Sequence, residues 1–273
     1  MKRCKNLLFI ALLTMFGSLL QKSQIKIEVN KVEAADYYDT ITDNATGSYL
    51  RAQLYDLMMK THKTYTSYDG LKSAYKTTDV DPNNPANVLL CYTGTSRTYN
   101  NMANNINREH VWPNSKGVGK SGPGSDAHHL RPCDLSLNSS RGNLDFDEVS
   151  NGRYASENGI TTQNKVGSNA FEPQDSTKGA IARIIFYVGM HYGPDSSYNL
   201  TIVDTIGNGK GKSIGKLSTL LKWNLEHPVG MDERRRNEAA QVIQGNRNPF
   251  IDHPEFACKI WGDYNEATRA ICK

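Results

Sequence analysis

The sequence predicts an α+β fold in which several helices are mixed with short strands. Four segments carry apolar residues at the spacing of an amphipathic helix, and one short apolar run has the length of a buried strand. The segments between them are polar and rich in glycine and asparagine, which is typical of loops. A chain of 273 residues is long enough to bury a substantial core.

In the first half of the chain, the expected elements are one helix and one buried strand. Residues 48–62 predict the helix from the apolar face formed by Leu50, Leu54, Leu57 and Met58. Residues 79–85 contain a turn-rich break, and the apolar run at 88–92 predicts the strand. Residues 114–124 are rich in glycine and are expected to form a loop.

The second half is expected to be mainly helical. A short helix is expected within 133–140, followed by loops and short strands over 142–169. Asp175 or Ser176 can cap a helix that runs to about Tyr192. Two more helices are predicted at 217–225 and 232–244.

The N-terminal segment has the pattern of a secretory signal peptide. Lys2, Arg3 and Lys5 precede an apolar run at 7–20 that is too short to span a bilayer comfortably, and a small-residue cleavage pattern ends at Ala34. An uncleaved amphipathic anchor is the alternative. We therefore expect a signal peptide at 1–34 and a single domain at 35–273, which is exported to the medium or the periplasm and has no further membrane contact.

The charge of the chain does not by itself indicate a nucleic-acid partner. The net charge is +4 and the isoelectric point is about 8.7. Residues 1–34 hold six Lys or Arg against two Glu, which accounts for the whole +4 and leaves the remainder close to neutral. Any argument for nucleic-acid binding must rest on local chemistry.

The cysteines predict at least one disulfide after export. Four follow residue 34, namely Cys91, Cys133, Cys258 and Cys272. An even number in an exported chain indicates disulfides, with three pairings open, and loop length favours Cys258 with Cys272. There is no Cys-x-x-Cys pair, which argues against a structural zinc site.

Residues suited to phosphodiester hydrolysis gather in one part of the sequence. Three of the seven histidines fall at 110, 128 and 129, beside carboxylates, arginines and Asn138. Hydrolysis needs a base that deprotonates water, a cation that neutralises the phosphate and leaving oxygen, and donors that hold the phosphate. Each of these roles has a candidate in residues 108–143.

His110 is the candidate base, because an imidazole takes up a proton near neutral pH. Glu109 and the side-chain carbonyl of Asn138 are hard oxygen ligands, which suit one Mg²⁺, Ca²⁺ or Mn²⁺ ion rather than zinc. Neighbouring strand residues point to opposite faces, so Glu109 and His110 can share a site only where the strand ends. Trp112 and Pro113 are expected to end it.

Several nearby residues can also be explained by structural rather than catalytic roles. A lone histidine is more often packed than catalytic, and His128 and His129 cannot both face one site, so at least one of them should support the site from behind. Asp126 is either a turn residue or such a supporting partner. Arg234, Arg235 and Arg236 are most simply a solvated helix face paired with Glu233 and Glu238.

The same segments resemble the bacterial Endonuclease I family of extracellular and periplasmic nucleases, within the His-Me finger (ββα-metal) superfamily. The combination of Arg-Glu-His-Val-Trp-Pro with the tail Asn-Arg-Asn-Pro-Phe-Ile-Asp is highly specific. The resemblance extends over roughly residues 47–260. Its matching segments are 108–113, 126–132, 138–143, 178–183 and 244–254.

The resemblance implies two antiparallel strands and a helix packed around one divalent ion. It implies that His110 is the general base, that Glu109 and Asn138 hold the ion, and that Arg141 has a catalytic place near the phosphate. Arg131 and Arg247 are expected to contact the substrate. The expected products carry 5′-phosphate ends, and the protein is expected to be a monomer.

The sequence favours one of three functions from different classes. The first is an endonuclease that acts on the backbone of DNA, RNA or both, with weak sequence preference. A zinc hydrolase is disfavoured because no His-Glu-x-x-His occurs. An exported nucleic-acid-binding module that has lost activity is disfavoured by the intact Glu109, His110 and Asn138. The motifs do not choose between DNA and RNA, since contacts to the 2′-hydroxyl decide that.

Overall fold

The computed structural model describes residues 37–100, 102–207 and 211–273. Contacts divide the chain into two units, Met1–Asn44 and Ala45–Lys273. In the first unit the described residues, 37–44, form turns. The expected signal peptide at 1–34 lies outside the described residues, and the domain limits of 35–273 stay a prediction. The architecture below is that of Ala45–Lys273.

The predicted α+β class is confirmed, and the described strands form small sheets. The hairpin of β4 and β5 is antiparallel, β10 and β11 are parallel, and the other sheets have the orders β1-β2-β3 and β6-β9-β8-β7. The strands are β1 (Val80–Asp81), β2 (Asn84–Leu89), β3 (Ser96–Thr98), β4 (Ile106–His110), β5 (Leu130–Asp134), β6 (Asp145–Phe146), β7 (Arg153–Glu157), β8 (Ile160–Val166), β9 (Ala170–Glu172), β10 (Thr201–Ile202) and β11 (Ser213–Ile214).

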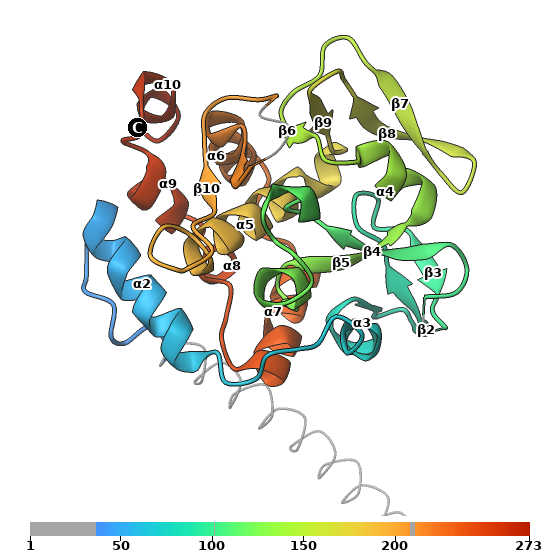
Figure 1. Ribbon diagram of the computed structural model, residues 1–273, viewed down its shortest axis with the longest axis horizontal. Coiled ribbons are helices and arrows are strands. Elements are labelled where there is room, and N and C mark those ends of the chain that lie inside the picture. Colours follow the sequence, from blue (N-terminus) through green and yellow to red (C-terminus); the bar gives the residue numbers. More distant parts are fainter. Residues whose placement is uncertain (1–36, 101, 208–210) are drawn as a thin grey trace, which may run out of the picture. The chain divides into compact units, whose positions relative to one another are not determined.

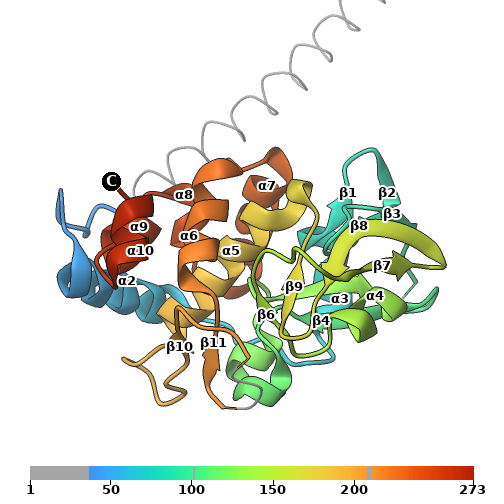
Figure 2. The same ribbon diagram turned by 90° about the horizontal axis from the view of Figure 1, so that it is seen from above.

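The helices surround and separate these sheets. Within this unit, α2, α9 and α10 gather on one side and the strands β1–β3, β7 and β8 on the other, with α5 between them (Figures 1 and 2). The helices are α2 (Gly47–Thr61), α3 (Leu71–Thr78), α4 (Leu135–Arg141), α5 (Asp175–His191), α6 (Leu217–Glu226), α7 (Met231–Gln244), α8 (Pro249–Asp252), α9 (Phe256–Trp261) and α10 (Glu266–Ile271), with 3₁₀ turns at Asn114–Lys116 and Gly122–Ser125.

Helix α5 is the centre of the core. Of its 17 residues 13 are buried, so it is covered on all sides rather than amphipathic. Gly189 lets β10 approach closely, because a Cβ there would lie 2.7 Å from Ile202 Cδ1. No described helix is long and apolar enough to cross a membrane.

Four expected helices are confirmed to within about two residues, as α2, α5, α6 and α7, and the short helix expected within 133–140 is α4. The strand expected at 88–92 is wrong in position. The strand is Asn84–Leu89, and the expected break at 79–85 contains β1 and the start of β2. Residues 90–92 are buried by tertiary contacts instead: Cys91 N donates to Pro132 O at 2.7 Å, and Tyr92 has a positive φ of 69°.

The C-terminal helices are joined by the expected disulfide. Cys258 in α9 pairs with Cys272 after α10, and their Cα atoms lie 5.4 Å apart. Cys91 and Cys133 are buried free thiols. The favoured pairing is therefore confirmed, and it lies in the C-terminal helices rather than in the β4–β5 hairpin.

Candidate active site

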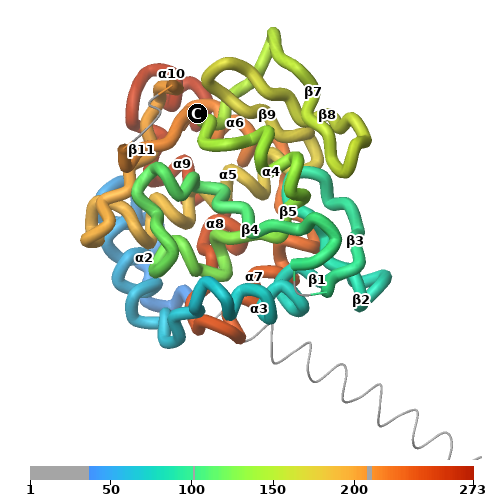
Figure 3. The backbone as a smooth tube through the Cα atoms, turned by 45° about the vertical axis from the view of Figure 1, so that its right-hand side comes forward, coloured from blue at the N-terminus to red at the C-terminus, as the bar shows by residue number. Residues whose placement is uncertain are grey.

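The hairpin of β4 and β5 carries most of the predicted chemistry, and α4 packs on one side of it (Figure 3). In the antiparallel register Glu109 lies opposite Arg131, and His110 lies opposite Leu130. Strand β4 ends at His110, as expected from the residues that follow. The backbone N–H of Trp112 donates to His129 Nε2 at 2.8 Å, which fixes the chain just beyond the strand end.

Helix α4 contacts β4 at two points, on either side of Glu109 and His110. The Asn138 amide nitrogen donates to Arg108 O at 3.3 Å, and Arg141 Nη2 donates to Val111 O at 2.6 Å. The helix begins where Asp134 Oδ1 accepts hydrogen bonds from two backbone N–H groups, a standard N-cap. The predicted arrangement of two strands and a helix is therefore present.

Glu109 is a buried carboxyl with few partners. It is 2% exposed, and its Oε1 accepts a hydrogen bond of 2.6 Å from the Tyr92 hydroxyl. Arg141 Nε is 3.5 Å away. Burial raises the pKa of Glu109 to about 7, although Arg141 and the Tyr92 hydroxyl both act to lower it. Since a carboxylate has about four acceptor positions, the described contacts leave room for a cation.

The donor set at this position fits a hard divalent ion. The Asn138 amide nitrogen is used by Arg108 O, which leaves the amide oxygen as its ligand atom. Carboxylate and amide oxygens are the ligands that Mg²⁺ and Ca²⁺ prefer. Two protein oxygens suit Mg²⁺ in particular, because this ion commonly keeps several waters and binds substrate phosphates directly.

His110 is mostly buried and neutral. Burial lowers its pKa to about 4, backbone hydrogen bonds to Gly119 and Gly124 act to raise it, and Arg108 and Arg141 lower it further. Its Nε2 has no hydrogen-bond partner among the described residues. A neutral imidazole has a nitrogen lone pair near pH 7, which is what a general base requires.

The ring of His110 is placed by two aromatic neighbours. The ring of Tyr68 stacks on it, with centroids 5.7 Å apart and planes at 22°, and His129 meets it edge-on at 6.0 Å. Tyr68 was not expected at this site. It lies in the segment before α3, more than thirty residues upstream of β4, and no motif or spacing in the sequence connects the two.

The adjacent His128 and His129 both have hydrogen-bonding roles inside the protein. His129 Nε2 accepts from Trp112 N, so its Nδ1 carries the proton that is donated to Pro123 O at 2.6 Å. His128 Nε2 lies 2.9 Å from Asn246 O. Burial lowers the pKa of His128 to about 4 and that of His129 to about 3. The expectation that at least one of them is structural therefore applies to both.

Comparison with known proteins shows the family to which this chain belongs. Residues 46–255 match the family model described as Endonuclease I. This chain belongs to the Endonuclease I family. It is 45% identical to an extracellular ribonuclease of Bacillus subtilis (strain 168), over 84% of this chain and 81% of the relative. It is 41% identical to an extracellular ribonuclease of Bacillus amyloliquefaciens, over 89% and 84%.

A third relative shares less of its length with this Endonuclease I chain. It is the Endonuclease-1 of Buchnera aphidicola subsp. Baizongia pistaciae (strain Bp), 30% identical over 55% of this chain and 63% of the relative. The resemblance inferred from the sequence motifs is thus confirmed at the level of the family.

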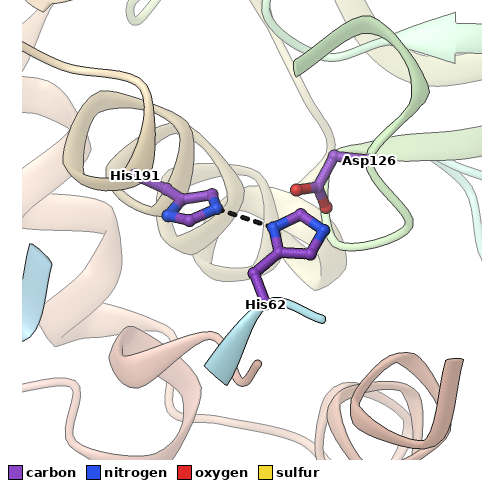
Figure 4. A group of neighbouring side chains, drawn as sticks. All are labelled: His62, Asp126 and His191. Atoms are coloured by element: carbon purple, nitrogen blue, oxygen red, sulfur yellow. Dashed lines mark hydrogen bonds between the residues drawn. The ribbon is translucent and has the colours of Figure 1, made fainter. Parts of the chain in front are cut away.

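Behind the hairpin, this Endonuclease I chain buries a second cluster of titratable residues, which we call the Asp126 cluster: His62, Asp126 and His191 (Figure 4). Their potential ligand atoms lie within 4.8 Å of one another. His62 Nδ1 and His191 Nε2 share a hydrogen bond of 2.8 Å. The three residues come from the end of α2, the loop before β5 and the end of α5.

Two histidines and a carboxylate could hold a transition metal, but the hydrogen bonding here fits poorly. Asp126 already accepts four hydrogen bonds, from the Tyr187 and Tyr192 hydroxyls, His128 N and Gln244 Nε2. Two nitrogens on one tetrahedral zinc lie roughly 3.4 Å apart, given Zn–N bonds of about 2.1 Å. The two rings would have to separate, and Asp126 would have to give up a partner. Glu109 and Asn138 fit a cation better.

The arginines expected near the substrate are engaged within the protein. Arg131 Nε lies 2.5 Å from Asp79 and, with Asp79 and Tyr92, lines a cavity of about 630 Å³. Arg141 is fully buried, with its guanidinium between Glu109 and the ring of Phe146. Arg141 is thus held next to Glu109, and its place near the phosphate stays a prediction.

Arg247 is also engaged within the protein. It is 1% exposed, and its nitrogens bind the carboxylates of Glu238 and Asp252 at 2.7 to 3.0 Å. These contacts hold the C-terminal segment to α7, and contact of Arg247 with substrate stays a prediction. The neighbouring Gln244 and Asn246 also serve the interior, because Gln244 binds Asp126 and Asn246 binds the Tyr187 hydroxyl. The specific tail motif is thus explained by packing.

The solvated face expected for the arginine run is wrong at Arg236. Its guanidinium is buried, and it binds Asp79 and the backbone carbonyls of Ala127, His128 and Leu130. The expected acidic partners are used elsewhere, Glu233 by Arg183 and Glu238 by Arg247. Arg236 therefore fixes the loop that leads into β5.

Proposed function

We propose that this Endonuclease I chain is an exported nuclease that hydrolyses phosphodiester bonds, with His110 as general base and one divalent ion on Glu109 and Asn138. One observation carries the proposal. Two consecutive residues at the end of β4 combine a neutral imidazole with a buried, weakly partnered carboxylate, and α4 is fixed on both sides of them. These are the parts that base-assisted hydrolysis requires.

In this proposal each residue has a defined task. His110 accepts a proton from water as the water oxygen bonds to phosphorus and the bond from phosphorus to the 3′-oxygen breaks. The 3′-oxygen takes up a proton from solvent, so the products carry 5′-phosphate and 3′-hydroxyl ends. The ion, when bound, supplies positive charge next to the phosphate and the leaving oxygen. Arg141 holds the Glu109 carboxylate and the chain at Val111 in place.

RNA is the substrate that the relatives favour. Two of them are named extracellular ribonucleases, and each alignment covers more than 80% of the relative's length. The same names, together with the basic and apolar N-terminal segment, support export of this chain. DNA is a second candidate, because attack by water on the phosphate makes no chemical use of the 2′-hydroxyl.

The test is digestion of matched RNA and DNA of one sequence, with Mg²⁺ and with EDTA. We expect cleavage of RNA, loss of cleavage in EDTA, and 5′-phosphorylated products. Equal cleavage of DNA would extend the substrate to both nucleic acids. Binding without cleavage would overturn the proposal and support an inactive binding module, and cleavage that persists in EDTA would overturn the role of the ion.

A further inference from the structure

Beside His110 lies an arginine whose charge the described residues do not neutralise closely. Arg108 is two residues before His110 on β4, so both side chains project from the same face of the strand. Its side chain is 15% exposed, and its Nε and Nη1 are buried without a hydrogen-bond partner among the residues that the structure describes. Arg108 Nη1 lies 3.6 Å from Asp69 Oδ1, and the Asp69 side chain is 79% exposed.

The contrast with the other arginines near the hairpin is clear. Arg131 lies 2.5 Å from a buried carboxylate, and Arg247 is held by two carboxylates. Asp69 is shared, because Lys72 Nζ binds it at 2.9 Å. Arg108 and Lys72 therefore have one exposed carboxylate between them, which leaves a net positive charge next to His110.

A second cation and an aromatic ring complete the group. The Arg108 guanidinium carbon lies 3.8 Å from the centroid of the Tyr68 ring, and Lys120 Nζ lies 5.7 Å from the same centroid. Lys120 is exposed and belongs to the glycine-rich loop between β4 and β5. The Tyr68 ring also stacks on His110, so one ring brings two cations together with the proposed base.

We propose that Arg108 and Lys120, assembled on Tyr68, form a subsite that binds a backbone phosphate of the nucleic-acid strand next to the bond being cut. This inference rests on the proposed function. A guanidinium presents several N–H groups in a plane and matches phosphate oxygens, and an ammonium adds a flexible point charge. The Tyr68 ring is already in contact with Arg108 and His110, so the subsite recognises backbone charge rather than a base.

The subsite also supplies what the composition lacks. Once the N-terminal 34 residues are removed, the chain is close to neutral, and a nuclease still needs local positive charge to hold a polyanion. Arg108 and Lys120 provide that charge at the face of His110. The sequence motifs point to Arg131 rather than Arg108 as a substrate contact, whereas in the structure Arg131 binds a buried carboxylate and Arg108 has only an exposed one nearby.

The test measures binding without cleavage. In the His110→Ala protein with Mg²⁺, the Kd for a labelled single-stranded RNA, and for DNA of the same sequence, is measured by fluorescence anisotropy over a series of NaCl concentrations. We expect a second change, Arg108→Ala, to weaken binding by roughly tenfold and to lower the slope of log K against log salt by about one. Lys120→Ala, at an exposed position, should also lower the slope.

The control and the milder variants keep the result interpretable. Arg269→Ala removes the same charge from α10, where Arg269 pairs with Asp263, and should change neither affinity nor slope. Arg108→Lys keeps the charge but not the planar group, so it should bind with intermediate affinity and an unchanged slope. Tyr68→Phe should have the affinity and salt slope of the His110→Ala parent. Tyr68→Leu should weaken binding as Arg108→Ala does.

The outcomes separate the two proposals. If the His110→Ala parent binds neither RNA nor DNA, the proposed function fails, and the subsite fails with it. If the parent binds but Arg108→Ala and Lys120→Ala leave affinity and slope unchanged, the subsite is overturned and the proposed function stands. Thermal unfolding of each variant shows that a loss of binding is not a loss of folded protein.

Discussion

Two histidine-bearing regions lie on either side of His129, and they differ in how fully their carboxylates are paired. On one side, His110 Nε2 and Arg108 have unpaired nitrogens among the described residues, and Glu109 accepts a hydrogen bond from Tyr92 alone. On the other side, Asp126 accepts four hydrogen bonds. Histidine nitrogens without a partner occur in both regions, since His62 Nε2, His128 Nδ1 and His191 Nδ1 also lack one among the described residues. The difference therefore lies in the carboxylates: Glu109 has acceptor positions left for a ligand, and those of Asp126 are filled.

His129 connects the two regions. It accepts from Trp112 N, just after the end of β4, and donates to Pro123 O in the loop that carries Asp126. His129 therefore connects the loop that carries Asp126 to the end of the strand that carries Glu109 and His110. A rigid second layer behind a reactive pair keeps its geometry within narrow limits.

The largest effect is expected at His110. His110→Ala should lower turnover by roughly two to four orders of magnitude, because a positioned acid–base group contributes about that much, while substrate binding stays nearly intact. His62→Ala is the matched change in the Asp126 cluster, and it should lower the melting temperature while the folded protein keeps its turnover. Turnover of His110→Ala within a few-fold of the wild type would remove His110 from the mechanism.

Acid should lower the free energy of unfolding, because three buried histidines stay neutral in the folded protein. Burial lowers the pKa of His128 to about 4 and the pKa values of His129 and His191 to about 3, whereas an unfolded histidine has a pKa near 6.5. Below about pH 6.5 the unfolded chain binds protons that the folded protein does not, so stability falls as pH falls. Each histidine contributes a slope of about 1.4 kcal/mol per pH unit, or about 4 kcal/mol for the three together.

Urea unfolding measured from pH 7.5 to pH 5 tests this expectation. His128→Asn removes one buried imidazole, so its stability should decline less steeply than that of the wild type, although it starts lower. Asp126 adds to the loss only in stronger acid, since its pKa is held at about 2 against the effect of burial, by His128, His62 and His191 and by the Tyr187 hydroxyl. A free energy of unfolding that is constant from pH 7 to pH 5 would contradict the account.

The sequence predicted elements with regular spacing and missed contacts made by tertiary packing. Helix α5 was predicted closely because its apolar residues are dense and continuous. The strand at 88–92 was misplaced because the burial of Cys91 and Tyr92 comes from β5 and Glu109 rather than from a sheet. A run of apolar residues reports burial, and does not report which neighbours provide it.

The candidate site shows the same limit. Glu109, His110 and Asn138 could be singled out because their chemistry is visible in the residue types. The contacts of Arg108, Arg141 and Arg247 could not be predicted. The role of an arginine depends on the groups that its guanidinium binds, and tertiary packing decides which groups those are. Those partners lie up to 39 positions away, as Asp69 is from Arg108, or nearby, as Asp252 is from Arg247.

The disulfide should matter for stability and not for turnover. Cys258 and Cys272 are separated by 14 positions and join α9 to the end of α10. Closing a loop of this length stabilises a protein by about 2 to 4 kcal/mol, so the double variant Cys258→Ser and Cys272→Ser should unfold at a lower temperature. Turnover at moderate temperature should be unchanged. A loss of turnover in protein shown by circular dichroism to be folded would mean that the C-terminal helices support the site.

The last expectation asks which region binds the divalent ion. In the proposed function Asn138 supplies an oxygen ligand, so in Asn138→Ala the Mg²⁺ or Mn²⁺ concentration for half-maximal activity should rise by about 10- to 100-fold, and excess ion should recover part of the rate. His191→Ala disrupts the Asp126 cluster, and should leave that midpoint unchanged in the folded protein. Isothermal titration calorimetry with Mn²⁺ gives the same comparison without catalysis. If His191→Ala shifts the midpoint and Asn138→Ala does not, the ion belongs to the Asp126 cluster, and the distinction between an open Glu109 and a filled Asp126 is wrong.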